Sequence, residues 1–213
     1  MFITFEGPEG AGKSTQVRLL AEFLRAAGHV VVVTREPGGT PIGDQVRAVL
    51  HDTANTAMAP TAEMLLYAAS RAQLVHEVIR PALAGGSVVL CDRYADSTMA
   101  YQGFGRGLDR AMLATLTAIA TGGLRPDLTL LLDLDVARGL GRRRDEGEEM
   151  NRLDLETIEF HERVRRGYLA LAAAEPGRWV YIDADRSVDT VQSDVRRVVV
   201  QRLTAVGGST SVV

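Results

Sequence analysis

Five short apolar runs, separated by longer helical patterns, limit the folds that this sequence can adopt. The runs cover residues 2–6, 29–34, 87–91, 128–134 and 179–182. Each is short and almost unbroken by polar residues, which is typical of strands buried on both faces of a parallel sheet. A buried helix could mimic one such run, but not five of them at these spacings. The sequence therefore predicts an α/β protein with a doubly wound, five-stranded parallel sheet flanked by helices.

The segments between these runs carry apolar residues at helical spacing. The predicted helices cover residues 13–27, 61–80, 110–121, 136–144, 155–174 and 188–203. The chain has 213 residues, which fits one domain. We expect that domain to span residues 1–205 and to include a mobile cover at about 142–152. The Gly- and Ser-rich end, 206–213, is expected to be a flexible tail.

Charge and cysteine usage exclude several classes of protein. The net charge of −3 does not favour a surface built to coat nucleic acid, so no nucleic-acid partner is expected. No apolar stretch is long enough to predict a membrane span, and no secretory signal is expected at the start. A single cysteine, Cys91, cannot form an internal disulfide. These features together predict a cytoplasmic protein.

The segment that joins the first strand to the first helix matches the phosphate-binding pattern G-x-x-x-x-G-K-[ST]. It reads Gly7-Pro8-Glu9-Gly10-Ala11-Gly12-Lys13-Ser14, followed by Thr15. Its glycines let backbone N–H groups converge on phosphate oxygens, at the positive end of a helix dipole. Lys13 is the one lysine among 24 basic residues, and a compact ammonium is what this position requires. We therefore predict that residues 7–15 bind ATP, that Lys13 contacts its β- and γ-phosphates and that Ser14 ligates Mg²⁺.

Charged residues follow two further strands. Asp92-Arg93-Tyr94 comes directly after the third run, and Arg35-Glu36-Pro37-Gly38-Gly39 follows the second. Carboxyl ends of parallel strands meet at one edge of the sheet, where ligands bind. Asp92 can hold Mg²⁺, directly or through water, and Arg93 can bind a phosphate.

The Asn-Lys-x-Asp segment of a GTPase is missing, since Lys13 is the only lysine, and the chain is too short for a large motor. Among proteins with such a phosphate-binding loop, a small kinase therefore remains.

Several segments together make the chain resemble the thymidylate kinase (dTMP kinase) family. They are residues 5–16 (Phe5-Glu6-Gly7 through Gln16), 34–40 (Thr34 through Thr40), 66–73 (Leu66-Tyr67-Ala68-Ala69-Ser70-Arg71-Ala72-Gln73), 92–97 and 100–103. The resemblance extends in order over residues 1–204. It implies the transfer of the ATP γ-phosphoryl group to dTMP, giving dTDP, with Mg²⁺, in a homodimeric enzyme.

The same resemblance implies roles on the dTMP side. Arg93 and Arg47 correspond to the residues that bind the dTMP phosphate, and Tyr67 to the aromatic residue that stacks on thymine. Arg71 matches the residue that reads a thymine carbonyl. The remaining expected contacts are Ser97 and Gln102 along the base, Tyr101 against the ribose 2′ position, Glu9 near the acceptor sugar, and Glu36 and Pro37.

The expected mobile cover contains a run of three arginines. Some members of the family carry an arginine inside the phosphate-binding loop, where this chain has Gly10. The resemblance therefore implies that the catalytic cation comes from the cover, from Arg142, Arg143 or Arg144. We take Arg142 and Arg144 as the candidates, although they lie about 200° apart on an ideal helix and cannot both face one ligand.

Two other functions stay open at this point. The chain could be a kinase for a different nucleoside monophosphate or for a deoxynucleoside. It could also be a nucleotide-binding regulatory module without turnover, although Lys13, Asp92 and Arg93 argue against that alternative.

Overall fold

The computed structural model describes residues 1–145 and 151–207. Within them, five strands form one parallel sheet in the order β2-β3-β1-β4-β5. The strands are β1 (Phe2–Glu6), β2 (Val31–Arg35), β3 (Val88–Asp92), β4 (Leu128–Asp133) and β5 (Trp179–Asp183). All five predicted strands are confirmed, with shifts of at most two residues at their ends.

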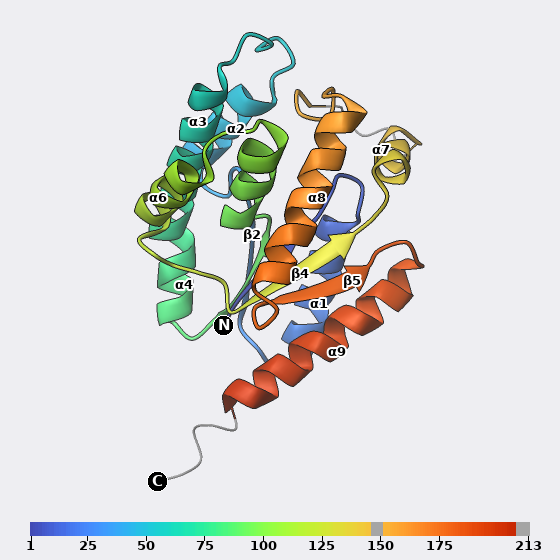
Figure 1. Cartoon of the computed structure of the whole chain (residues 1–213). Helices are drawn as coiled ribbons and strands as arrows, with labels where there is room; N and C mark the ends of the chain where they lie inside the picture. Colours follow the sequence, from blue (N-terminus) through green and yellow to red (C-terminus); the bar gives the residue numbers. More distant parts are fainter. Residues whose placement is uncertain (146–150, 208–213) are drawn as a thin grey trace.

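The helices cover both faces of this sheet (Figure 1). They are α1 (Lys13–Ala26), α2 (Pro41–His51), α3 (Pro60–Leu74), α4 (Arg80–Ala84), α5 (Ala95–Thr98), α6 (Arg110–Thr121), α7 (Val136–Asp145), α8 (Ile158–Ala174) and α9 (Val188–Gly207). Two π-helical segments, η1 (Val75–Ile79) and η2 (Met99–Gly105), continue α3 and α5.

Alternate residues of the central strand β1 face opposite sides of the sheet, as the pleat requires. Ile3 and Phe5 pack into a core with α1 and α9, whereas Phe2 packs with η1 and β3 on the other face. All five residues of β1 are buried, which explains the unbroken apolar run.

Several helix boundaries differ from the predictions for local reasons. Helix α2 was not predicted; it begins at Pro41, and the Thr40 hydroxyl caps it by accepting from Gly43 N. Helix α8 begins at 158 rather than 155, because Thr157 caps it in the same way. Helix α9 continues to 207, beyond its predicted end at 203 and into the first two residues of the predicted tail. Residues 208–213 of that tail and 146–150 of the predicted cover lie outside the described residues.

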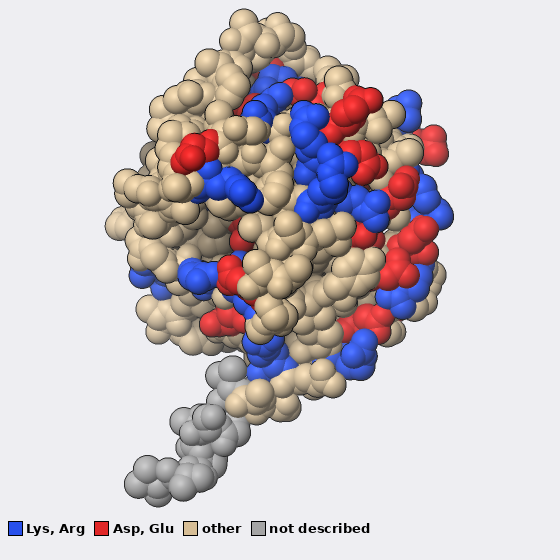
Figure 2. Space-filling model, viewed as in Figure 1, with Lys and Arg blue, Asp and Glu red and all other residues tan. Residues whose placement is uncertain are grey.

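Opposite charges lie next to each other on the face shown in Figure 2. Around the start of α9 they form ion pairs, with Arg186 and Arg197 both bound to Asp194 at 2.6 Å. None of the helices in the described part of the chain is long and apolar enough to cross a membrane.

Candidate active site

A cavity of about 500 Å³ lies at the carboxyl edge of the sheet. It is lined by most of the predicted site residues, which come from segments far apart in the sequence: Glu9, Gly10, Ala11, Gly12, Lys13, Ser14, Thr15, Glu36, Pro37, Arg47, Tyr67, Arg71, Asp92, Arg93, Ser97, Tyr101, Gln102 and Arg142. The predicted residues Gly7, Pro8 and Arg144 are not among its lining residues. The structure thus brings the predicted donor and acceptor groups into one space.

The phosphate-binding loop has the backbone that its glycines permit. Gly7, Gly10 and Gly12 have φ angles of 138°, 68° and 82°, which side chains disfavour. A Cβ atom at Gly10 would lie 2.1 Å from the carbonyl oxygen of Gly139 in α7. The close approach of α7 therefore leaves no room for a side chain at position 10, in agreement with a catalytic cation supplied from elsewhere.

Lys13 lies inside this loop and is 6% exposed. Its Nζ donates to the carbonyl oxygens of Pro8 at 2.7 Å and Gly7 at 3.2 Å. Burial, together with the charge of Arg93, lowers its pKa to about 8. Gly7 and Pro8 thus contribute by holding the lysine rather than by lining the cavity.

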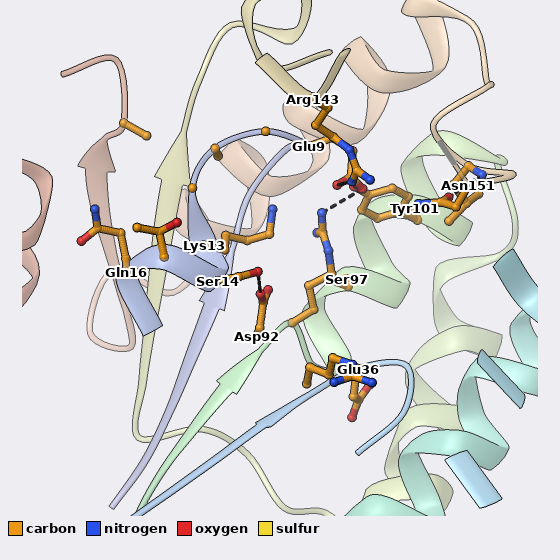
Figure 3. Close-up of a pocket in the computed structure, with 18 of the residues that line it drawn as sticks. Glu9, Lys13, Ser14, Gln16, Glu36, Asp92, Ser97, Tyr101, Arg143 and Asn151 are labelled. Carbon is orange, nitrogen blue, oxygen red and sulfur yellow. Dashed lines mark hydrogen bonds and ion pairs between the residues drawn. The ribbon is translucent and has the colours of Figure 1, made fainter. Parts of the chain in front are cut away.

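Ser14 and Asp92 meet at the base of the cavity (Figure 3), where the Ser14 hydroxyl donates to Asp92 Oδ2 at 2.5 Å. They come from the start of α1 and the end of β3, 78 residues apart. Hydroxyl and carboxylate oxygens are ligands that suit Mg²⁺. Because Mg²⁺ keeps waters and substrate phosphates as ligands, it does not need a protein cage. Among the described residues, no group of three or more His, Cys, Asp or Glu could form one.

Glu9 joins the loop to three other elements. Its carboxylate accepts from Tyr101 Oη at 2.8 Å and forms ion pairs with Arg93 at 2.9 Å and Arg143 at 3.2 Å. Burial disfavours its charged form, but the charges of Arg93, Lys13 and Arg143 outweigh burial and hold its pKa below the usual range. Figure 3 shows Glu9, Arg143 and Tyr101 together beside Lys13.

Arg93 is held in an unusual backbone conformation, with a φ of 67°. Its Nη1 donates to Gly7 O at 3.0 Å and to Tyr168 Oη at 2.9 Å. A strained, non-glycine residue of this kind is typical of functional sites, where the surrounding contacts compensate for the strain. Tyr168 was not predicted; nothing in the sequence links α8 to Arg93.

The other half of the cavity, around α3 and η2, is built from buried polar pairs. Arg71 is 1% exposed, and its Nε donates to Glu36 at 2.8 Å. Gln102 donates to Glu63 at 2.8 Å, and Ser97 donates to Glu6 at 2.6 Å. Pro37 O accepts from Arg47 Nη1 at 3.0 Å. Glu36 and Pro37 are thus positioned to orient Arg71 and Arg47.

The three arginines of α7 diverge, as their helical spacing requires. Arg142 lines the cavity next to Ala184, whose carbonyl oxygen accepts from its Nη1 at 3.4 Å. Arg143 also lines the cavity and pairs with Glu9 and with Asp154, at 3.1 Å. Arg144 is exposed, and its Nε donates to Leu140 O of its own helix at 3.4 Å. The structure therefore places Arg143, rather than Arg144, at the cavity.

Sequence reasoning missed one whole wall of the cavity. This wall follows β5 and consists of Ala184, Arg186, Ser187, Val188 and Val191. The end of β5 lies at the same edge as those of β1 and β3, so the topology could have indicated it. It also missed His51, Thr98, Asn151 and Leu153, which carry no motif. Gln16 and Arg35 belong to motif segments of the sequence, but no role was predicted for them.

A doubly wound sheet, a phosphate-binding loop with a buried lysine, and a second set of arginines across one cavity define a small phosphotransferase of the P-loop class. The family model for thymidylate kinase matches residues 5–195. The chain belongs to the thymidylate kinase family.

Individual thymidylate kinases are similar to this chain over nearly its whole length. The thymidylate kinase of Trichlorobacter lovleyi is 56% identical over 208 residues, with 95% of this chain and 98% of the other covered. That of Deinococcus radiodurans is 56% identical over 202 residues, with 95% and 97% covered. The crystal structure of thymidylate kinase from Ehrlichia chaffeensis is 34% identical in sequence and has a TM-score of 0.76. The match covers 93% of this chain and 97% of the other.

Proposed function

We propose that this chain carries out the reaction of its family in the cavity described above. It transfers the γ-phosphoryl group of ATP to dTMP and gives dTDP for dTTP synthesis. The observation that carries this proposal is that two cations act on one carboxylate, Glu9: Arg93 from the acceptor side pairs with it at 2.9 Å, and the charge of Lys13 from the loop also lowers its pKa. Two phosphate-binding groups facing each other across one site suit a donor and an acceptor phosphate.

On the donor side, residues 7–15 bind the ATP phosphates, and Ser14 and Asp92 hold Mg²⁺, Asp92 directly or through water. The 2.5 Å contact between their oxygens supports this ligand pair. When bound, the ion would neutralise charge on the phosphate oxygens. Lys13 stabilises the same charge from inside the loop.

On the acceptor side, Arg93 and Arg47 bind the dTMP phosphate, and Tyr67 stacks on the base. Arg71 donates to a thymine carbonyl from a buried position that Glu36 fixes. The other contacts are Pro37 beside Arg47, Ser97 and Gln102 along the base, Tyr101 at the ribose 2′ position and Glu9 at the sugar.

The catalytic cation comes from α7. Arg142 and Arg143 are the arginines of this run that line the cavity, and Arg143 is the one beside Glu9. We assign transition-state charge stabilisation to Arg143 and contact with the donor nucleotide to Arg142, next to the wall that follows β5. Arg144 points away and takes no part.

A coupled assay for ADP release tests the function directly. We expect turnover with dTMP, and much less with UMP, CMP or thymidine; dUMP is included to define the role of the thymine methyl group. Lys13→Ala is the matched inactive control. No ADP release with ATP and dTMP would overturn the proposal and favour a regulatory module.

The domain, the assembly and the compartment are also proposals. Residues 1–205 form the kinase domain, with a cover at about 142–152. The enzyme is a cytoplasmic homodimer that binds neither nucleic acid nor membranes. Exposed apolar side chains on α2, α3 and α6, namely Ile42, Leu65, Met112 and Ile119, support a dimer surface. Light scattering after gel filtration should give twice the 23.0 kDa mass of the chain.

A further inference from the structure

A buried carboxylate, Glu63, lies directly behind the cavity wall formed by Gln102. It occupies the first turn of α3, is 1% exposed and does not itself line the cavity. Its Oε1 accepts from Gln102 Nε2 at 2.8 Å, and its Oε2 accepts from Arg106 at 3.1 Å and from Arg152 at 2.5 Å. The roles assigned above do not use this residue.

These contacts keep Glu63 ionised. Burial disfavours the charge, but hydrogen bonds from Arg106, Gln102 and Arg152 outweigh it and lower the pKa of the carboxyl group. An ionised carboxylate can only accept hydrogen bonds. Any group that faces it at hydrogen-bond distance must therefore present a donor.

This restriction fixes the orientation of the Gln102 amide. The NH₂ group must point toward Glu63, so the amide oxygen of Gln102 points away from Glu63. Gln102 is 1% exposed and lines the cavity in which Arg71 also lies. The cavity thus combines the Gln102 amide oxygen, which only accepts hydrogen bonds, with the Arg71 guanidinium, which only donates them.

We propose that Glu63 is a positioning residue for base selection: it holds the Gln102 amide so that the site accepts pyrimidines with an N3–H donor and rejects those whose N3 is an acceptor. This inference rests on the proposed dTMP site. Thymine offers an N3–H donor and carbonyl acceptors, which match the two groups. Cytosine offers an N3 lone pair and an exocyclic NH₂ group, so both contacts would be mismatched. A mismatch of buried polar groups is how a site discriminates against an analogue of nearly the same shape.

The first experiment compares kcat/KM for dTMP and dCMP in the wild-type enzyme and in Glu63→Gln. The variant has the same shape but can also donate, so the Gln102 amide is free to turn. We expect the preference for dTMP over dCMP to fall roughly tenfold to a hundredfold, the effect of one mismatched buried hydrogen bond. The KM for ATP should not change. Equal losses with both substrates would show a merely structural role and overturn the inference.

A matched control and a double variant sharpen this test. Glu77 accepts from Gln73 at 2.8 Å in a pair of the same kind at the surface. Glu77→Gln should leave the substrate preference unchanged. In a Gln102→Leu background, Glu63→Gln should not change the preference further, because Glu63 acts through Gln102. A further drop in that background would contradict the proposal.

A second measurement reports the orientation of the Gln102 amide in the wild-type protein itself. The side-chain NH₂ resonances of Gln102, assigned by their loss in Gln102→Leu, should exchange slowly with solvent in ¹⁵N-labelled enzyme. They should show no contact to the base when dTMP binds. Direct NH₂-to-base contacts would overturn the inference. If the wild-type enzyme did not phosphorylate dTMP at all, the proposed function would fail instead, which distinguishes the two outcomes.

Discussion

Replacement of Arg143 by alanine tests the assignment of the catalytic cation. The Arg143 side chain is 16% exposed and is held between Glu9 at 3.2 Å and Asp154 at 3.1 Å. A positioned arginine contributes about 10³–10⁵-fold to phosphoryl transfer, which corresponds to about 4–7 kcal/mol of barrier. If Arg143 were only part of a charged cover, its loss would change the rate a few-fold, as exposed charges do. The two possibilities therefore predict very different losses of kcat in Arg143→Ala.

The assay is ADP release at saturating ATP and dTMP, with ATP affinity measured separately by equilibrium binding. We expect Arg143→Ala to lower kcat at least a hundredfold with little change in ATP affinity. Arg144→Ala is the matched control and should be nearly silent, because that side chain bonds only to Leu140 of its own helix among the described contacts. Arg142→Ala should act mainly on the KM for ATP.

Thermal unfolding separates a catalytic loss from a folding defect. Arg143→Ala leaves Glu9 paired with Arg93 and Tyr101, and leaves Asp154 bound to Asn151 N, so the fold should persist. Three equal, mild losses at Arg142, Arg143 and Arg144 would refute the reasoning. The cation would then have to come from another residue.

Four further outcomes are expected. Lys13→Arg should lose most of the turnover of the wild-type enzyme, since the larger planar group does not fit the buried site inside the loop; near-normal activity would contradict this. Arg71→Ala should raise the KM for dTMP roughly tenfold to a hundredfold but not that for ATP; equal changes in both would indicate a structural role. Tyr101→Phe should keep the preference for deoxyribose, because the ring excludes the 2′-hydroxyl, while Tyr101→Ala should reduce it; an unchanged ratio in the alanine variant would place selection elsewhere. Burial and the nearby charge of Asp96 raise the pKa of Glu6 to about 7 in the folded protein, so the folded state binds more protons than the unfolded chain between about pH 4.5 and 7. Its contribution to stability is therefore lost as pH rises through that range, and Glu6→Gln should flatten the pH dependence of the melting temperature; an unchanged dependence would refute it.

The sequence by itself determined the sheet, the phosphate-binding loop and the family. Each of these depends on neighbours in the chain: unbroken apolar runs predict buried strands, and glycines before a lone lysine predict a loop that opens a helix. Because parallel strands end at one edge, the sequence also predicted that Lys13, Asp92 and Arg93 would meet. In the structure all three line one cavity.

Tertiary structure decided which side chains hold the site in place. Glu63 bonds to Gln102 and Arg152, at separations of 39 and 89 residues, and Tyr168 bonds to Glu6 at a separation of 162. No periodicity in the sequence records such pairs, because they depend on how α3, η2 and α8 pack. The choice of Arg143 over Arg144 has the same origin. Adjacent arginines are equivalent in sequence, and only the rotation of α7 against the phosphate-binding loop decides which one faces the cavity.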